Sequence, residues 1–477
     1  MRPDKIIMTA IAWIRRSMRE HDNTALVEAS KEHEKVIPFY VVDDDYFENA
    51  DLGYPRVKFW RESLVEFRED LKDKGKDLIV RKGDPVEQLK KIVEETDADK
   101  IYFNRDYSKY SRERDEKVRG LDVEVEDFKD LTMFEKEEIL TNDGSPYQTY
   151  TYYAKKWFKN DKRRPQEVED YEVPEVESVE VPTLKELGFE KPDDLEWNWN
   201  PGREGGLKRI EEFKDKILDY DEDRDYAWKD STSKLSPHLK FGTVSIRECF
   251  WEAERIKARN PNSDTSGVKT WQEELAWRDF YFQMLWNYPE SQEKALLEQF
   301  RSIDWRSKND AKDDWEAFIN GKTGFPFVDA GMRQLKKTGW MHNRLRMVVT
   351  SFACKDLWLD WKDLHQFFNE NFVDAEKASM IGGIQWAYSI GTDAQPYFRV
   401  FNPWTQGEKY DPDGEYIRKW VPELSDVPDE YIHKPHKMNQ IAQKESNCEI
   451  GEDYPRPIVD HDEQREKAVE RFEDARE

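Results

Sequence analysis

The segment WQEELAWRDFY combines a carboxylate, a guanidinium group and aromatic rings at helical spacing. Four of its side chains would share one face of a helix, with a fifth beside them: Trp271, Glu274, Arg278 and Tyr281, and then Trp277. A carboxylate among aromatic rings can recognise a planar, base-like ring by stacking and hydrogen bonding. The same pattern also fits an ion pair between Glu274 and Arg278 on a buried aromatic face, which is a common arrangement in helices.

A second segment, STSKLSPHLKFG at residues 231–242, places hydroxyl groups just before a proline and an expected helix. Side-chain and backbone donors at such a helix start can bind an anion. By itself this signal is weak, because Ser and Thr are also the usual N-terminal caps of helices.

The charge distribution bears on a nucleic-acid partner. A net charge of −26 argues against DNA binding unless the acidity serves solubility, as it does in salt-loving organisms. Residues 331–355, however, hold six Lys or Arg and no Asp or Glu. A basic segment in so acidic a chain favours a phosphate-bearing ligand. An ordinary solvated helix face is the alternative.

Two patterns of secondary structure must position these residues. In the first 130 residues, short apolar runs alternate with helical periodicity, which predicts a parallel sheet covered by helices on both faces. The expected strands are 6–14, 36–42, 78–80, 100–103 and 123–125, and the expected helices include 56–74 and 85–95. Ligands of such sheets bind beyond the carboxyl ends of the strands, although neither a GxGxxG nor a Walker sequence occurs here.

The rest of the chain has a different composition. Residues 161–200 are acidic and contain four prolines, which indicates a linker. Beyond residue 203 the periodicity is helical, and 13 of the 18 Trp lie between Trp228 and Trp420. We therefore predict an α/β domain with a Rossmann-like parallel sheet over 1–135, a linker over 136–202 and an all-α domain over 203–477.

A low-charge run rich in Trp and Gly, from Gly339 to Trp404, is hard to explain as core alone. The stretches KTGFPFVDAGMRQLKKTGWMHNRLRM and GTDAQPYFRVFNP, together with TSKLSP, resemble the signatures of class I cyclobutane-pyrimidine-dimer photolyases in the DNA photolyase/cryptochrome family. The segments AWIRR, GDP and YFNRD resemble the antenna domain of that family. The resemblance spans essentially the whole chain.

The resemblance implies FAD in the helical domain and blue-light-driven repair, in which reduced FAD passes an electron to the dimer, the ring splits and the electron returns. It implies an FAD surrounded by Tyr220, Thr232, Ser233, Lys234, Leu235, Ser236, Trp271, Glu274, Arg278, Tyr281, Arg346, Asp374, Ala375, Glu376 and Met380. Arg346 would pair with Asp374 near the flavin ring. A cryptochrome-like light sensor with lost or altered repair is the alternative function.

The resemblance also implies a pocket for a dimer flipped out of DNA. Trp277 and Trp386 would flank the dimer, Glu274 and Asn343 would bond its carbonyl edges, and Met347 would pack against it. Arg224 and Arg344 would contact DNA phosphates, with Lys240 as a further candidate. The stretch WMHNRLRM, in place of the His-rich version of the (6-4) relatives, favours cyclobutane dimers.

The chain departs from the family pattern beside the flavin. Met380 stands where the family's photolyases have an Asn facing flavin N5, and a thioether cannot donate a hydrogen bond. Ile384 replaces the Trp nearest the flavin in the family's three-Trp electron chain. The two outer members are retained as Trp361 and Trp305, while Trp358, Trp386 and Tyr388 are aromatic residues that could substitute. Glu376 replaces an Asp.

A second chromophore is expected in the α/β domain. Tyr110 and Ser111 stand where folate-binding members have an Asn-Glu pair, which argues against folate. Arg56, Asp106 and Lys240 resemble positions of a deazaflavin site. We therefore expect 8-hydroxy-5-deazaflavin as the antenna chromophore, with FMN or an empty site as alternatives.

Composition excludes several other classes. No apolar run reaches the ~18 residues of a membrane span, so we expect no membrane association. Three widely spaced cysteines give neither a disulfide framework nor an iron–sulfur site, which fits the reducing cytoplasm. His433, His436 and Cys448 have poor spacing for zinc, and we expect no metal. We expect a monomer that acts on damaged DNA.

Overall fold

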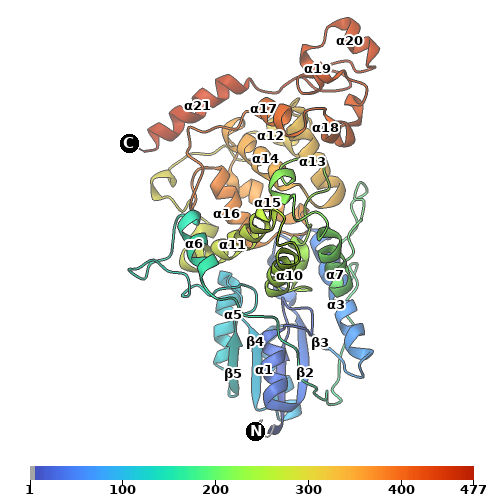
Figure 1. Ribbon diagram of the computed structural model, residues 1–477, viewed down its shortest axis with the longest axis vertical. Coiled ribbons are helices and arrows are strands. Elements are labelled where there is room, and N and C mark those ends of the chain that lie inside the picture. Colours follow the sequence, from blue (N-terminus) through green and yellow to red (C-terminus); the bar gives the residue numbers. More distant parts are fainter. Residues whose placement is uncertain (1–5, 477) are drawn as a thin grey trace.

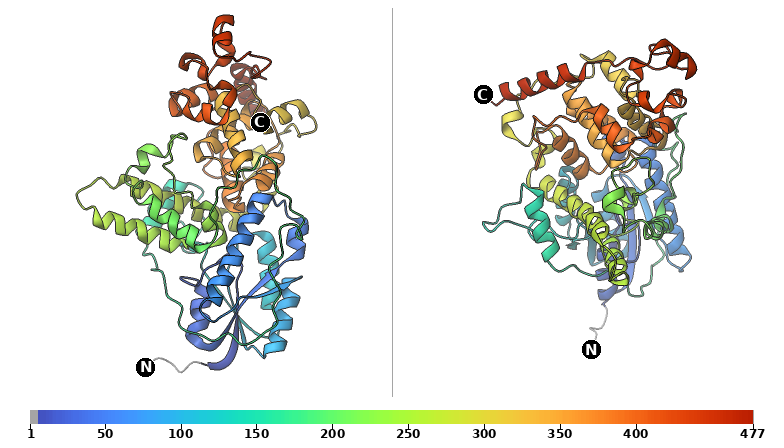
Figure 2. Two further views of the ribbon diagram at one scale, coloured as in Figure 1. Left: turned by 90° about the vertical axis from the view of Figure 1, so that its right-hand side faces the viewer. Right: turned by 45° about the horizontal axis from the view of Figure 1, so that its top comes forward.

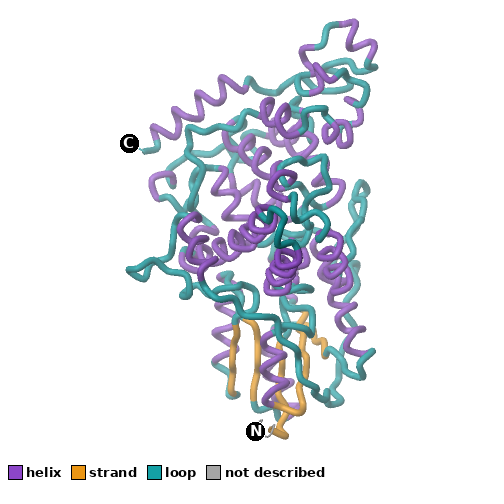
Figure 3. The backbone as a smooth tube through the Cα atoms, viewed as in Figure 1, coloured by secondary structure: helices purple, strands orange, loops and turns teal. Residues whose placement is uncertain are grey.

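The computed structural model of the protein describes residues 6–476. A five-stranded parallel sheet with the order β3-β2-β1-β4-β5 forms one end of the molecule (Figures 1 and 3). Its strands are β1 (Ile6–Trp13), β2 (His33–Val42), β3 (Ile79–Lys82), β4 (Lys100–Asn104) and β5 (Glu124–Phe128). All five predicted strands and the parallel pairing are confirmed.

Both faces of the sheet are buried. Successive side chains of β1 point to opposite faces, and each set packs against helices. Ala10 and Ala12 pack in one core cluster, and Ile11 and Trp13 pack in another. The first cluster contains residues of α1 (Thr24–Glu32) and α3 (Tyr54–Lys72), and the second contains residues of α4 (Pro85–Thr96) and α5 (Lys109–Arg119). The short helix α2 (Asp44–Asn49) follows β2. The predicted helices on both faces are confirmed.

The segment 136–202 is not the plain linker that we predicted. It contains α6 (Tyr150–Lys159), whose Tyr150, Tyr153 and Trp157 are buried against the helical domain. Their spacing of three and four residues gives the helix one apolar face. The stretch that follows runs along the sheet, where the Val179 N–H donates to the Val80 carbonyl at 2.9 Å.

Helices make up the remainder and lie over one end of the sheet (Figure 2). The main core joins α12 to α16 with α18 and α21, and a second core forms around α10 and α11. The helices are α7 (Gly202–Phe213), α8 (Tyr220–Asp223), α9 (Ser236–Phe241), α10 (Ile246–Arg259), α11 (Ser266–Asn287), α12 (Lys312–Ile319), α13 (Pro326–Thr338), α14 (Asn343–Lys355), α15 (Trp361–Asn371), α16 (Lys377–Ala387), α17 (Pro403–Tyr410), α18 (Glu415–Trp420), α19 (Asp429–Ile432), α20 (Gln440–Glu445) and α21 (His461–Asp474). In the described part of the chain, no helix is both long and apolar enough to cross a membrane.

A buried ion network fixes the sheet domain against α10. Arg247 donates to Asp22 and to Asp130 at 2.7 Å each, and Arg19 donates to Asp130 at 2.8 Å. All four side chains are at most 2% exposed, so removing one partner would leave an uncompensated buried charge. The network holds the carboxyl ends of the strands against the helical domain.

Candidate functional site

The aromatic and charged face of α11 forms as predicted, but without an ion pair between Glu274 and Arg278. The Glu274 carboxylate accepts a hydrogen bond from Arg224 at 2.6 Å. Arg278 donates instead to the backbone carbonyls of Leu131 and Leu239. The ordinary helix pair that the sequence left open is therefore not formed.

Trp277 stacks on Tyr150 of α6, with ring centroids 3.6 Å apart and planes 9° apart. Sequence reasoning missed this partner because it assigned α6 to a linker. The other predicted lesion contacts come from neighbouring helices: Asn343 is exposed at the start of α14, and Met347 and Trp386 are half-buried on α14 and α16. One face of Trp277 is therefore covered by Tyr150.

Asp374 joins three segments that the sequence analysis linked to FAD. It accepts from Arg346 at 2.8 Å and from the Ser236 hydroxyl at 2.5 Å. The predicted pair of Arg346 and Asp374 is present, and the Arg346 guanidinium also lies 4.1 Å from the ring centroid of Phe372. Of the loop before Ser236, Leu235 is buried and Lys234 donates to Asp230 at 2.6 Å.

The free space around α16 shows whether a flat cofactor fits among these residues. A Cβ on Gly382 would lie 2.1 Å from the Tyr281 ring, whereas a Cβ on Gly383 would meet no heavy atom within 4 Å. Tyr281 therefore fills one side of α16, and open space lies beside Gly383. Met380 lies one turn earlier and is 8% exposed. Open space beside α16, together with Arg278 paired only to carbonyls, fits FAD.

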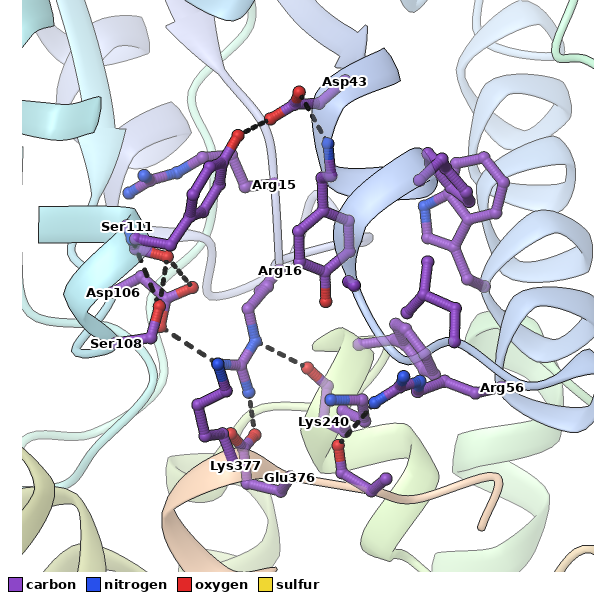
Figure 4. Close-up of a pocket in the computed structure, with 18 of the residues that line it drawn as sticks. Arg15, Arg16, Asp43, Arg56, Asp106, Ser108, Ser111, Lys240, Glu376 and Lys377 are labelled. Carbon is purple, nitrogen blue, oxygen red and sulfur yellow. Dashed lines mark hydrogen bonds and ion pairs between the residues drawn. The ribbon is translucent and has the colours of Figure 1, made fainter. Parts of the chain in front are cut away.

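A second cavity, of about 310 Å³, lies at the carboxyl ends of the strands, where parallel sheets bind ligands (Figure 4). Arg56, Asp106 and Lys240 all line it, so the residues that we assigned to the antenna lie in one cavity. Arg16 also lines the cavity. Its guanidinium donates to Asp106 at 3.1 Å, to the Lys240 carbonyl at 3.1 Å and to Glu376.

Ala375 and Glu376 line this second cavity, although the resemblance assigned them to FAD. Glu376 pairs with Arg16, while Asp374 pairs with Arg346. Asp374 lies in the turn after α15, whereas Glu376 caps α16 in an extended conformation, and this turn lets the two carboxylates point to different sites. The loop before α16 thus contributes Asp374 to one site and Glu376 to the other.

Charge is unevenly balanced in this cavity. Burial would raise the pKa of Asp106, but Arg16 and Arg15 hold it well below its ordinary value. Arg56 is 7% exposed, has an unpartnered Nε and donates only to backbone carbonyls. Burial lowers the pKa of Lys240 to about 7, with Arg16 and Arg56 adding to this effect and the nearby Glu376 carboxylate opposing it. Among the described residues, neither Arg56 nor Lys240 has a carboxylate partner, which favours an anionic ligand.

Two family models match the chain: DNA photolyase over residues 10–174 and FAD binding domain of DNA photolyase over residues 271–474. The chain belongs to the DNA photolyase/cryptochrome family. A deoxyribodipyrimidine photo-lyase of Halobacterium salinarum is 38% identical over 97% of this chain and 98% of its own. A class III photolyase structure from Agrobacterium tumefaciens is 33% identical with a TM-score of 0.90, covering 99% of this chain and 98% of its own.

A third relative is an archaeal photolyase structure from Sulfolobus tokodaii, described as containing two FAD molecules. It is 30% identical, with a TM-score of 0.84, and covers 98% of this chain and 100% of its own. The expected family, the two-domain architecture and the FAD-binding domain are therefore confirmed, and the FAD-domain match contains most of α11 and all of α14 and α16.

Each of the six cations in the basic segment 331–355 has a partner in the structure. Lys355 is 2% exposed and donates to Ser389 at 3.1 Å. The other five cations each have a partner: Arg333 with Glu423, Lys336 with Asn320, Lys337 with Glu196, Arg344 with Asp225 and Arg346 with Asp374. The local sequence has no acid because the acids come from elsewhere in the chain.

The ring that lies against Trp305 is Trp358, with centroids 4.5 Å apart. Tyr388 lies 5.2 Å from Trp305, and its hydroxyl donates to the Leu359 carbonyl. Trp361 is buried at the start of α15, and Ile384 is buried in the main core. Tyr388 follows Ile384 by one turn at the end of α16, so Trp305, Trp358 and Tyr388 form an aromatic group in the same core as Ile384.

Proposed function

We propose that the protein is a deoxyribodipyrimidine photo-lyase that repairs cyclobutane pyrimidine dimers in DNA with blue light and FAD. The observation that carries this proposal is the cluster of Asp374, Arg346 and Ser236, in a domain where α11 and α14 both pack against α16. The full-length similarity to deoxyribodipyrimidine photo-lyases supports it.

In this proposal, bound and reduced FAD supplies the electron that splits the dimer after light absorption. The protein binds the flipped-out dimer and excludes water. Trp386 and the face of Trp277 opposite Tyr150 stack against it, which suits a base-like ligand. Asn343 donates its amide to a carbonyl edge of the dimer. Arg346 and Asp374 hold each other in place beside the cofactor.

The decisive experiment uses the full-length protein, chemically reduced and illuminated with blue light in the presence of a duplex carrying one dimer. Restored bases in the light sample, and none in a dark sample, support repair. A reduced, FAD-loaded protein that binds the duplex but restores no bases under light would overturn the proposal.

For the antenna cavity we infer an anionic planar chromophore, with 8-hydroxy-5-deazaflavin as the first choice. Arg56 and Lys240 would bind its acidic ring or its tail, since Arg56 donates to backbone carbonyls and neither cation forms an ion pair with a carboxylate among the described residues. FMN or a second FAD would place a phosphate on the same cations. Titration of the purified protein with each compound, followed by energy transfer to FAD, distinguishes them.

A light sensor with altered repair is the second candidate, because Met380 and Ile384 stand where repair enzymes of the family have Asn and Trp. With Ile384 interrupting the chain, photoreduction of oxidised FAD should be slow or use another route. Ile384→Trp should then accelerate it in the presence of an external donor. Fast photoreduction in the unchanged protein that is lost in Trp358→Phe would assign the route to the Trp305 and Trp358 pair.

A further inference from the structure

Four charged side chains form a chain at the mouth of the proposed lesion pocket. Arg224 contacts Glu274 at 2.6 Å and lies 4.0 Å from Asp225. Arg344 contacts Asp225 at 2.7 Å. Two cations and two carboxylates alternate, so the chain is neutral. Both arginines that we assigned to DNA phosphates are paired to carboxylates in the DNA-free protein.

Glu274 depends on Arg224 for its charge. Burial raises the pKa of Glu274 above its ordinary value, and Arg224 offsets only part of this rise. The titratable groups that face Glu274 are Arg224, Asp225 and Tyr220 around α8, Tyr150 of α6, and Glu273 and Tyr281 of its own helix. Arg224 is the only cation in this set, so Glu274 has no second source of compensation there.

DNA would compete directly for Arg224. Its side chain is 27% exposed, which leaves the guanidinium free to turn toward solvent. A phosphate group offers the same forked hydrogen-bonding geometry as a carboxylate. A bound backbone can therefore replace Glu274 as the partner of Arg224.

The dimer would at the same time change the surroundings of Glu274. The side chain is 33% exposed in the DNA-free protein, and a dimer in the pocket would cover it. An ionised carboxylate that loses both water and its cation is strongly disfavoured. It also has no hydrogen to donate to a carbonyl oxygen of the dimer.

We propose that binding of dimer-containing DNA moves Arg224 from Glu274 to a backbone phosphate, and that Glu274 then takes up one proton from solvent. The neutral acid donates its O–H to a carbonyl of the dimer. Arg224 keeps its own proton, so one proton enters per dimer bound and no electron moves. This inference rests on the proposed function, because it assumes that Glu274 faces the dimer.

The exchange would serve both specificity and repair. Undamaged DNA does not fill the pocket, so Glu274 stays hydrated and ionised and no proton is taken up. When an electron reaches the dimer, negative charge develops on its carbonyl oxygens. A neutral donor stabilises that charge, whereas a carboxylate at the same place would oppose it. Arg224 is in this sense a positioning residue that controls the charge of Glu274.

The test is calorimetric titration of the FAD-loaded, full-length protein with a duplex carrying one dimer, in the dark, in phosphate and in Tris at one pH. The difference in binding enthalpy between the buffers gives the number of protons taken up. We expect close to one proton for the dimer duplex at pH 7 and none for the undamaged duplex. Affinity for the dimer duplex should fall about tenfold per pH unit across the uptake window.

Three variants make the test specific. Glu274→Gln should bind the dimer duplex with no proton uptake and with pH-independent affinity, while Glu273→Gln on the same helix should behave like the unchanged protein. Arg224→Gln should shrink the uptake on the acid side, because Glu274 is then already protonated in the free protein.

Three results would overturn different parts of the argument. A protein that prefers the dimer duplex but shows no buffer-dependent enthalpy overturns the proton exchange and leaves the proposed function standing. A protein that does not distinguish the two duplexes at all overturns the lesion pocket itself. Unchanged uptake in Glu274→Gln also overturns the inference, because the proton then belongs to another group.

Discussion

The two sites differ in whether their cations are paired with carboxylates. In the cavity at the carboxyl ends of the strands, Arg56 and Lys240 have no carboxylate partner among the described residues. At the mouth of the proposed lesion pocket, Arg224 and Arg344 are paired at 2.6 Å and 2.7 Å with acids. Both sites are proposed to bind anions, so the difference reflects how each anion is held.

An enclosed cavity can keep uncompensated cations if its ligand stays bound, because the ligand supplies the missing charge. A surface that binds and releases a polyanion has no such permanent partner. In a chain of net charge −26, acids near that surface satisfy the cations until DNA arrives. The comparison therefore predicts strong effects at the cavity and weaker, exchangeable effects at the mouth.

The largest effect is expected when the two unpaired cationic side chains of the cavity are replaced. Each charge-assisted hydrogen bond contributes about 1.5–3 kcal/mol, so Arg56→Met combined with Lys240→Met should weaken binding of 8-hydroxy-5-deazaflavin at least 100-fold. Fluorescence titration measures the affinity, and FAD content measured by absorbance is the control. Chromophore binding that survives both substitutions would contradict the comparison, because the unpaired cations would then not mark an anion site.

The next effect concerns recognition inside the lesion pocket, where stacking rather than charge should dominate. Trp277→Ala should lower affinity for dimer-containing DNA by about 1–3 kcal/mol, the value of one stacked base. Tyr152→Ala, which removes a ring that is 59% exposed on α6, is the matched control. Gel-shift titration with damaged and undamaged duplexes checks this. Equal loss of affinity for both duplexes would assign Trp277 to general DNA contact.

The sequence could predict the features that depend on local residue patterns. Alternating apolar residues in β1 fix which side chains face each layer, so the sheet was predictable. Motif resemblance brought Ser236, Arg346 and Asp374 together correctly. The acids that neutralise residues 331–355 come from distant segments, as Asp225 does for Arg344, and no local pattern reveals them.

A third effect is the pH dependence of ligand affinity that Lys240 should cause in the cavity. Burial lowers the pKa of Lys240 to about 7, so in the empty cavity Lys240 loses its proton as the pH rises above 7. An anion in the cavity restores the charge. Affinity for a ligand that is already ionised at pH 7 should therefore fall, by up to about tenfold per pH unit. Lys240→Met should flatten this dependence. A pH-independent affinity in the unchanged protein would mean that Lys240 faces away from the ligand.

The smallest effect is expected at the mouth, where partners only exchange. Asp225 competes with DNA for Arg344. The Arg344 side chain is 13% exposed and that of Asp225 is 32% exposed, and an ion pair that water still reaches contributes about 0–1 kcal/mol. Asp225→Asn should therefore strengthen binding to undamaged DNA by no more than about fivefold. Asp194→Asn removes one negative charge in the exposed linker and controls for net charge.

Arg344→Gln should act in the opposite direction. It should weaken binding to damaged and undamaged DNA alike and reduce the slope of log affinity against log salt by about one. Fluorescence anisotropy over a range of salt concentrations gives both quantities. If Asp225→Asn and Asp194→Asn had the same effect, the gain would come from net charge alone. The pairing of Arg344 with Asp225 would then be incidental, and the contrast between the two sites would reduce to a difference in burial.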